Sequence, residues 1–249
     1  MHRFFIPPEE CHNTPLRLGE AEAKHARSVL RLRDGDRVVV LNGAGKEFLC
    51  QAEEVRSDST ILKIIQENSI APLPFEITLY QAVTKGKTMD LIIQKATELG
   101  AHRVVPVLSE RSVPDWDEAK ATAKVEKWRS VCIESIKQCG SPWLPKLEMP
   151  MTPSAAIEDA RGAEVSLIAT LQSDAKHPRT HIDGYEAENS QAPKKLAIWV
   201  GPEGDYTPAE INQIRGSSLP ITLGPLVLRS ETAAIYCLAF LNYELQSRP

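Results

Sequence analysis

The sequence lacks long apolar runs and paired cysteines, and these absences exclude several classes of protein. None of its 249 residues lies in a stretch approaching the roughly 20 uninterrupted apolar residues that a transmembrane helix needs. The N-terminus also lacks the apolar region of a signal peptide. The five cysteines form no C-x-x-C pair, which argues against a disulfide framework or a zinc cluster. We therefore expect a cytoplasmic protein that binds no metal and does not enter the membrane.

An excess of positive charge is also missing. The 29 Lys and Arg residues stand against 33 Asp and Glu, a net charge of −4, which excludes indiscriminate nucleic-acid binding through bulk charge. Residues 1–74 carry 10 basic and 11 acidic side chains, and residues 75–249 carry 19 and 22. Because neither part is basic overall, a nucleic-acid contact would have to use a local cluster of cations.

The N-terminal part has the pattern of a small β-rich domain. Asn42, Gly43 and Gly45 separate two apolar runs, and an Asn-Gly turn between such runs is a strong hairpin signal. Pro72 and Pro74 then interrupt the chain, and beyond them the pattern changes. We place a domain boundary there, between residues 1–73 and 74–249. The elements expected before it are strands at 37–42, 47–55 and 60–65 and a short helix at 20–30.

Strands and helices alternate beyond the boundary, which predicts an α/β fold with a mainly parallel sheet. Gly100 suits a left-handed cap at the end of the first helix, and Thr207, Pro208 and Glu210 form a capping box. Residues 173–195 are polar and contain proline and glycine, so we expect a mobile surface excursion. The expected strands are 75–83, 103–108, 165–170, 196–200 and 221–223, and the expected helices are 88–99, 120–138, a short one from 207, and 231–245.

Two loops carry candidate chemistry. In the first, Gly201 to Gly204 follow an apolar strand, and glycines there let a ligand approach the backbone, although a tight turn would explain them equally well. In the second, Ser230 could cap the long C-terminal helix and Glu231 favours its positive end. Capping leaves Arg229 unexplained, because a cation before a helix start opposes the helix dipole. An anionic ligand at this helix start would explain it.

Familiar nucleotide and metal motifs are missing. The segment 42–47 lacks the first glycine and the Ser or Thr of a Walker loop, and Phe48 stands where a dinucleotide motif needs its third glycine. These departures argue against nucleotide hydrolysis and a Rossmann cofactor. His177 and His181 lie four residues apart, but we expect Pro178 to disrupt the helix that would bring them together, so no metal site is expected.

A basic cluster lies in residues 24–33, which contain four cations and no acid. Such a cluster is either a solvated face or a surface that contacts RNA phosphates. Lysines at 85, 87 and 95 would extend a phosphate-contacting surface into the second domain. The candidate RNA-binding residues are Arg3, Arg17, Lys24, Arg27, Arg31, Arg33, Lys85 and Lys87.

Six segments in order resemble those of one family: MHRFF, HARSVLRLRDGD, KGKTMDLIIQKATELG, PVLSERSV, VGPEGDYTPAE and LGPLVLRSETAA. They are similar to segments of the bacterial 16S ribosomal RNA (uracil-N3) methyltransferases of the SPOUT superfamily. This resemblance covers essentially the whole chain. It implies a PUA-like, OB-like β-barrel, then an α/β methyltransferase domain with a C-terminal trefoil knot. It also implies a homodimer that uses S-adenosylmethionine to methylate the 16S RNA of the small ribosomal subunit.

The resemblance further implies roles for individual residues. Arg229 would stabilise the uracil anion that forms when N3 loses its proton, and Glu203 and Glu231 are the alternative proton acceptors. The residues implied in cofactor binding are Thr170, Leu171, Gly201, Pro202, Glu203, Gly204, Leu223, Gly224, Leu228, Arg229, Ser230, Thr232 and Ala233.

The chain departs from the family pattern at several positions. Asp205 stands where a third glycine is usual, Ser230 replaces the usual threonine, and Cys139 lies where the family often has a glutamine-serine pair followed by arginine. Two other functions fit the same resemblance: a non-catalytic RNA-binding or ribosome-assembly factor, and a knotted methyltransferase acting on another RNA position. Intact Gly201, Glu203 and Arg229 argue against loss of catalysis.

Overall fold

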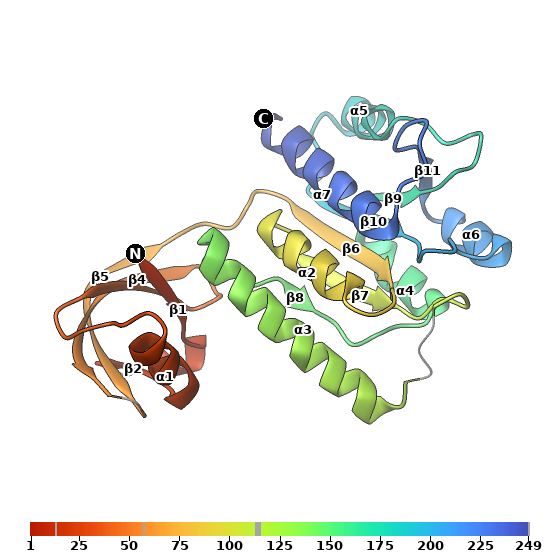
Figure 1. Ribbon diagram of the computed structural model, residues 1–249. Helices are drawn as coiled ribbons and strands as arrows, with labels where there is room; N and C mark the ends of the chain where they lie inside the picture. The colour runs from red at the N-terminus through yellow and green to blue at the C-terminus, as the bar shows by residue number, and fades with distance from the viewer. Residues whose placement is uncertain (13, 57, 113–115, 249) are drawn as a thin grey trace. The chain divides into compact units, whose positions relative to one another are not determined.

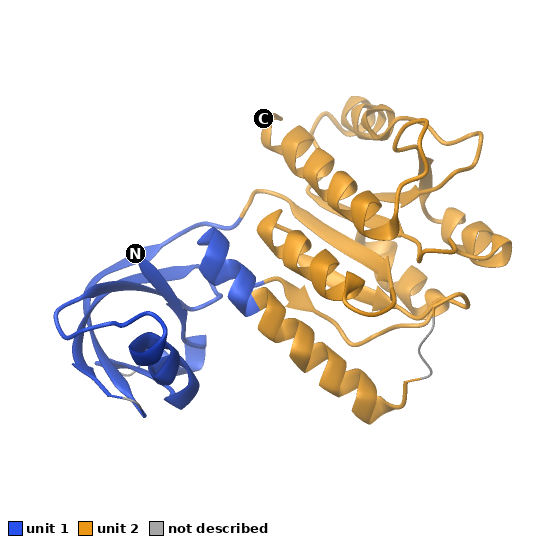
Figure 2. Cartoon of the chain, viewed as in Figure 1, with its two compact units in different colours: residues 1–72, 133–144 blue, residues 73–132, 145–249 orange. Residues whose placement is uncertain are grey.

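The computed structural model describes residues 1–12, 14–56, 58–112 and 116–248, which form two compact units (Figure 2). Unit 1 contains Met1–Pro72 and Ile133–Leu144, and unit 2 contains Leu73–Cys132 and Pro145–Pro249. Helix α3 (Glu118–Cys139) therefore contributes its last turns to unit 1. Each unit has its own sheet and its own core.

Unit 1 is built on a five-stranded sheet in the order β1-β3-β4-β5-β2. The predicted hairpin is confirmed: β3 and β4 pair antiparallel with Val40 opposite Phe48. The side chain of Asn42 accepts the amides of Ala44 and Lys46 at 2.8 and 2.9 Å, which holds the turn. The elements are β1 (His2–Phe5), η1 (Pro8–Glu10), β2 (Leu16–Leu18), α1 (Glu20–Ser28), β3 (Arg37–Leu41), β4 (Lys46–Val55) and β5 (Thr60–Ser69).

Residues 133–144, distant in sequence, complete unit 1. Gly45 has a φ of +88°, and a Cβ there would lie 2.4 Å from Cζ2 of Trp143, so the indole occupies the space of a side chain. The Gly45 amide donates to the Pro142 carbonyl at 2.9 Å, and Trp143 Nε1 donates to the Ile70 carbonyl at 3.0 Å. The turn of the hairpin is therefore glycine-rich because this segment packs directly against it.

Unit 2 is built on a six-stranded, fully parallel sheet in the order β11-β9-β10-β6-β7-β8. The central β10 is buried along both faces from Leu196 to Val200, as expected of a strand covered by helices on both sides. The strands are β6 (Glu76–Ala82), β7 (Arg103–Val107), β8 (Lys146–Leu147), β9 (Val165–Ala169), β10 (Lys195–Val200) and β11 (Leu219–Ile221).

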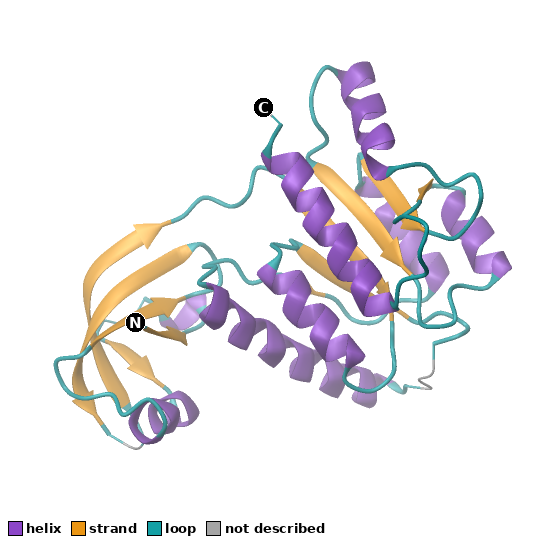
Figure 3. Cartoon of the chain, turned by 45° about the horizontal axis from the view of Figure 1, so that its top comes forward, coloured by secondary structure: helices purple, strands orange, loops and turns teal. Residues whose placement is uncertain are grey.

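Helices cover both faces of this sheet (Figures 1 and 3). On one face, Trp199 stacks on Tyr80 with ring centroids 4.4 Å apart, in a core shared with Ile211 and Ile214. On the other face, the first and last helices of the unit pack against each other. The helices are α2 (Thr88–Glu98), α3, α4 (Pro153–Asp159), η2 (Ala160–Gly162), α5 (Pro178–Asn189), α6 (Pro208–Arg215) and α7 (Ser230–Gln246).

The expected mobile excursion at 173–195 is wrong, because most of it is helix α5. Pro178 begins that helix instead of disrupting it: a proline at the first helical position loses no helical hydrogen bond. Ile182 is fully buried, and Arg179 donates to the carboxylate of Glu244 on α7. Long-range packing therefore orders a segment whose local composition is polar.

Other predicted helix features stand. Gly100 follows α2 with a φ of +75°, and both hydrogen bonds of the Thr207–Glu210 capping box are present. The predicted helix at 120–138 is present as α3, in which Cys132 and Ile136 are buried and Cys139, at its end, is exposed. Within the described residues there is no helix able to cross a membrane and no group of side chains able to hold a metal ion.

Candidate functional site

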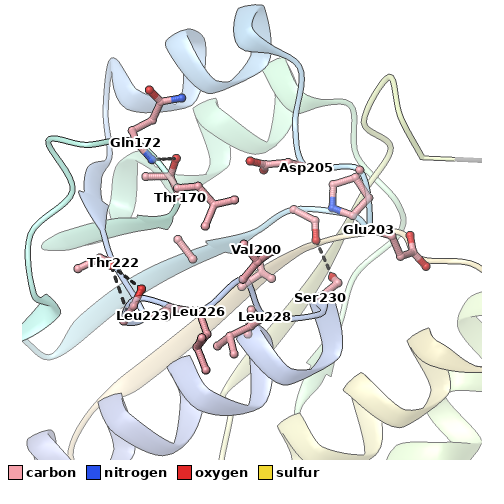
Figure 4. A pocket seen from close by; sticks show the side chains of 18 of the residues that line it. Thr170, Gln172, Val200, Glu203, Asp205, Thr222, Leu223, Leu226, Leu228 and Ser230 are labelled. Carbon is pink, nitrogen blue, oxygen red and sulfur yellow. Dashed lines mark hydrogen bonds between the residues drawn. The ribbon is translucent and has the colours of Figure 1, made fainter.

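A cavity of about 480 Å³ lies at the carboxyl ends of the parallel strands of unit 2 (Figure 4). The loops after β9, β10 and β11 line it, together with Ser230 and Ala233 in the first turn of α7. The chain adds β7 and β8 on one side of β6, and then places β9, β10 and β11 on the other. In open parallel sheets, ligands bind outside the carboxyl ends of strands where the strand order reverses in this way.

The walls of the cavity differ in chemistry. The loop 222–228 forms an apolar wall, and Leu226 and Val227 there are 73% and 77% exposed because no other described residue covers them. Thr170, Gln172 and Asp205 add polar groups on the opposite side of the cavity (Figure 4). One apolar wall facing a few polar groups is the usual construction of a small-molecule site.

Residues 201–205 form a tight turn beside the cavity. The Asp205 amide donates to the Pro202 carbonyl at 2.9 Å, and Asp205 has a φ of +59°. A Cβ at Gly201 would lie 2.8 Å from Oδ1 of Asp205, so this position accepts only glycine without rearrangement. The buried Tyr206 hydroxyl donates to the Val200 carbonyl at 3.2 Å, and burial raises the pKa of Tyr206, which keeps it a neutral donor.

Ser230 joins three elements at this site. Its hydroxyl donates to the Gly201 carbonyl at 2.5 Å and accepts from Nε2 of Gln81, on β6, at 3.0 Å. Gln81 is fully buried and also donates to the Ala82 carbonyl at 2.9 Å. The expectation that Ser230 caps α7 is wrong: Arg229 occupies the cap position, and the Ser230 hydroxyl bonds to a neighbouring loop instead.

The predicted catalytic residues lie at or next to the cavity. Arg229 is exposed, and its side chain has no hydrogen bond or ion pair with any described residue. Glu203 lines the cavity, but its side chain turns away from the centre (Figure 4), and Oε1 accepts the Lys85 amide at 3.2 Å. Glu231 is half-buried in the first turn of α7.

A second loop, after β7, supports the 201–205 turn. Arg111 Nη1 donates to the Gly204 carbonyl at 2.6 Å. Glu210, at the start of α6, accepts the Glu110 amide at 2.8 Å and the Thr207 amide at 2.8 Å.

Arg111 and Gln81 were not predicted to contribute to the site. Arg111 lies in one of the six family-like segments, which is a signal that could have identified it, whereas the place of Gln81 depends on contacts with distant residues.

All the residues expected to bind cofactor line the cavity except Arg229 and Thr232, which lie in the adjoining first turn of α7. The structure thus brings together three loops that are separated by up to about sixty residues in sequence. Several lining residues were not anticipated, and each lies next to or close to an anticipated one in the sequence. They are Ala169, Gln172, Val200, Asp205, Thr222, Pro225, Leu226 and Val227.

The basic residues expected to bind RNA fall into two groups. Arg3 donates to the carbonyls of Lys137 and Gln138 at 3.2 and 3.1 Å, so it has a structural partner within unit 1. In unit 2, Lys95 pairs with Glu98 at 2.7 Å. The others are exposed and form no ion pair with any described acid, and they are Arg17, Lys24, Arg27, Arg31, Arg33, Lys85 and Lys87.

Comparison with known families gives two matches. Residues 71–242 match an RNA methyltransferase domain family, and residues 18–65 match an RNA methyltransferase PUA domain family. The chain is similar to ribosomal RNA small subunit methyltransferase E of Aquifex aeolicus, with 31% identity over 97% of this chain and 99% of that protein. It is 28% identical to the Bacillus subtilis protein of the same name, over 99% of this chain and 98% of that protein.

Solved structures are also similar. The putative methyltransferase Lpg2936 from Legionella pneumophila, in complex with the cofactor SAM, has a TM-score of 0.87 and 30% identity, covering 98% of both chains. The ribosomal RNA small subunit methyltransferase E of Neisseria gonorrhoeae, bound to S-adenosyl methionine, has a TM-score of 0.84 and 25% identity, also covering 98% of both chains.

Proposed function

The chain belongs to the RNA methyltransferase family, and on that basis we propose that it methylates N3 of a uracil in the 16S RNA of the small ribosomal subunit, with S-adenosylmethionine as methyl donor. The observation that carries this proposal is the cavity at the carboxyl ends of β9, β10 and β11. Its relatives by sequence are small-subunit RNA methyltransferases, and two structural relatives bind this cofactor.

The cavity fits S-adenosylmethionine in size and chemistry. Its volume of about 480 Å³ lies within the range typical of sites for small molecules and cofactors. The apolar wall at 222–228 suits the adenine ring, and the glycines of the 201–205 turn let backbone groups approach the ligand. Bound there, the cofactor would supply an electrophilic methyl group. The residues proposed to hold it are those expected from the sequence, with Arg229 and Thr232 at the margin.

Arg229 is proposed to stabilise the uracil anion. Removal of the N3 proton spreads negative charge over both uracil carbonyl oxygens, and a guanidinium beside them lowers the free energy of that anion. The Arg229 side chain has no competing partner among the described residues, and it precedes the positive end of α7, so an anion there would meet both the side chain and the helix dipole. A uracil anion bound there would also explain why an arginine precedes the start of α7, where a cation otherwise opposes the helix dipole.

Glu231 is the favoured proton acceptor. Glu203 already accepts the Lys85 amide and turns away from the centre of the cavity, whereas the Glu231 side chain bonds to no described residue and lies two residues from Arg229. A carboxylate that takes the N3 proton must reach it directly or through one water molecule. The neighbouring position of Glu231 on the first turn of α7 favours this arrangement.

We also propose that unit 1, with residues 1–73 as its main part, binds the RNA. Five exposed cations from Arg17 to Arg33, none of which pairs with a described acid, would contact phosphates, which dominate binding to structured RNA together with its shape. Residues 74–249 then form the catalytic domain. Since ribosomal RNA is its substrate, the protein is proposed to act in the cytoplasm.

A trefoil knot and a homodimer complete the proposal. The bonds from Ser230 to Gly201 and Gln81 support a C-terminal segment that passes close to the loop after β10, as a knot requires. Tyr236, Ala239 and Tyr243 form an exposed apolar stripe on α7, at helical spacing, and Tyr243 is 73% exposed. A second copy of the chain would remove this stripe from water.

Nucleoside mass spectrometry of 16S RNA from a deletion strain tests the proposal. We expect 3-methyluridine to disappear and to return when the gene is restored. Loss of a different modified nucleoside would instead indicate another RNA position. Calorimetry with S-adenosylmethionine tests the alternative of a non-catalytic assembly factor, because such a factor would show no binding at millimolar cofactor.

Arg229→Ala tests the catalytic assignment. Removing one group that stabilises developing negative charge typically lowers the rate constant by about 100- to 1,000-fold, so we expect a loss of that size in single-turnover methylation. Affinity for S-adenosylmethionine should stay within a few fold, since the cofactor is held mainly by the loops. Arg161→Ala, an exposed arginine on η2, is the control. Near-normal turnover by Arg229→Ala would remove this residue from the mechanism.

A further inference from the structure

Asp205 places a carboxylate in the wall of the cavity in a fixed orientation. Its backbone is left-handed, with a φ of +59°, a conformation that aspartate tolerates better than most residues. Oδ1 accepts the Tyr206 amide at 2.7 Å, which fixes the side-chain rotamer. The side chain points into the cavity toward the side that holds Thr170 (Figure 4).

The second carboxylate oxygen of Asp205 has no partner among the described residues. The other acids of these loops are satisfied differently: Glu210 uses both oxygens on backbone amides, and Glu203 uses one oxygen on the Lys85 amide while facing outward. No described cation pairs with Asp205. A carboxylate oxygen held toward a cavity is an acceptor available to a ligand that carries hydroxyl or ammonium donors.

The position of Asp205 in the cavity indicates which part of the ligand it would contact. The adenine ring suits the apolar wall at 222–228. With the catalytic roles proposed for Arg229 and Glu231, the methyl-bearing sulfur would lie toward the start of α7. The ribose connects these two parts of S-adenosylmethionine, so it crosses the middle of the cavity, which the 201–205 turn borders. A carboxylate that accepts a hydrogen bond from the ribose recurs in dinucleotide sites, and one free oxygen is enough for this because a carboxylate oxygen has two lone pairs.

We propose that Asp205 binds the ribose hydroxyls of the adenosyl cofactor through its free Oδ2. This inference rests on the proposed function, since it assumes an adenosyl ligand in this cavity. The contact is equally available to S-adenosylmethionine and to the demethylated product, because both carry the same ribose. Asp205 therefore sets the affinity for both, and its loss should raise the KM for the cofactor while leaving kcat nearly unchanged.

Calorimetry with S-adenosylhomocysteine tests the contact directly. We compare wild type with Asp205→Gly, which keeps the left-handed backbone, and with Asp205→Asn, which keeps an oxygen for the Tyr206 amide. A hydrogen bond to a charged group corresponds to about a ten- to hundredfold change in affinity. We expect Asp205→Gly to bind at least about tenfold more weakly, with Asp205→Asn in between. Glu188→Gln, an exposed acid on α5, should not differ from wild type.

Deoxy analogues identify the group that Asp205 contacts. For wild type we expect a tenfold or greater loss of affinity when adenosine is replaced by 2′-deoxyadenosine or by 3′-deoxyadenosine, and a loss below threefold for Asp205→Gly. Equal losses in the two proteins would overturn the assignment. So would an Asp205→Gly effect seen with S-adenosylhomocysteine but absent with 5′-methylthioadenosine, because the carboxylate would then hold the amino-acid ammonium.

The same binding measurements test the proposed function separately from the ribose contact. Binding of S-adenosylhomocysteine to wild type supports an adenosyl site whatever Asp205 does, and only the difference between variants bears on the ribose contact. If wild type bound no adenosyl ligand at millimolar concentration, the proposed cofactor and this assignment would both be wrong.

Discussion

Replacing Ser230 with alanine should loosen the loop after β10. The substitution removes the donor to the Gly201 carbonyl, at 2.5 Å, and the acceptor for Gln81 Nε2, at 3.0 Å. Gln81 keeps the Ala82 carbonyl as a partner, so the main loss is at Gly201, whose carbonyl has no other partner among the described residues. Ser230 is buried and Gly201 is half-buried, and loss of such a hydrogen bond with one group left unpartnered costs about 1–3 kcal/mol. We therefore expect unit 2 to lose about 2 kcal/mol of unfolding free energy.

Thermal unfolding and calorimetry measure the two consequences. For a chain of this size, 1 kcal/mol corresponds to about 2–4 °C, so the unfolding midpoint should fall by about 4–8 °C. Cofactor affinity should fall as well, because the Gly201 carbonyl anchors a loop that lines the cavity. Ser230→Thr, which retains the hydroxyl, should behave like wild type. Ser154→Ala, at an exposed serine on α4 whose hydroxyl bonds to no described residue, should change stability by less than about 0.5 kcal/mol.

Unchanged stability and cofactor binding of Ser230→Ala would contradict this role of the hydroxyl. If Ser230→Ala unfolded within 1 °C of wild type and bound the cofactor equally well, the Gly201 carbonyl would have found another partner or water. The role assigned to Ser230 would then be wrong.

Three further predictions concern the rest of the molecule. Charge reversal by Arg27→Glu with Arg31→Glu should weaken binding to a 16S RNA fragment at least tenfold at low salt and flatten its salt dependence, measured by filter binding. Arg103→Leu should cost about 3 kcal/mol at pH 7 in urea unfolding, because it leaves Asp159 and Glu148 without the guanidinium that bonds both carboxylates. Gly45→Ala should destabilise unit 1 by about 3 kcal/mol in urea, since its Cβ would overlap Trp143 and its φ is positive.

The pH dependence gives Arg103 a second test. Hydrogen bonds from Arg103 lower the pKa of Asp159 in the folded state, so the stabilisation is fully present above the unfolded pKa of about 3.9 and is lost as pH falls through the lower folded value. The gap between wild type and Arg103→Leu should therefore be constant near neutrality and shrink below about pH 4. A gap that stayed constant down to pH 2 would contradict the ion-pair explanation.

Controls accompany the other two predictions. Charge reversal of Arg56 and Lys63, which already pair with Glu54 and Glu53, should leave RNA affinity nearly unchanged. Equal weakening by both charge reversals would mean that net charge, not the cluster at 24–33, governs binding. Gly184→Ala places a methyl group in open space on α5 and should not destabilise the protein. A stable Gly45→Ala would show that the Trp143 side chain can move aside.

The sequence predicted those features whose causes are local. Apolar runs mark the strands, Gly100 marks a left-handed helix end, and Thr207 with Glu210 marks a helix start, because each depends on residues within a few positions. The glycines after β10 and the residues before α7 could also be identified as parts of one site, and the structure brings them to one cavity.

The features that the sequence could not predict depend on distant partners. The polar segment of α5 is ordered because Ile182 is buried and Arg179 meets Glu244. The hydroxyl of Ser230 has a typical capping position by sequence, yet it bonds to a carbonyl 29 residues away. In the sequence Gln81 is an ordinary strand residue. Its hydrogen bond to the Ser230 hydroxyl depends on a residue far away in the chain, so no local pattern predicts it.

The segment that completes unit 1 also sets an order in time for the growing chain. The Gly45 amide and the Ile70 carbonyl acquire their partners only when Pro142 and Trp143 have left the ribosome, about seventy residues after the strands of unit 1 have been made. At a synthesis rate of about 5–20 residues per second, Gly45 remains uncovered by the indole for several seconds. The strands of unit 1 are therefore synthesised before the tryptophan that packs against Gly45, and a nascent chain halted before residue 143 would contain this sheet without that indole.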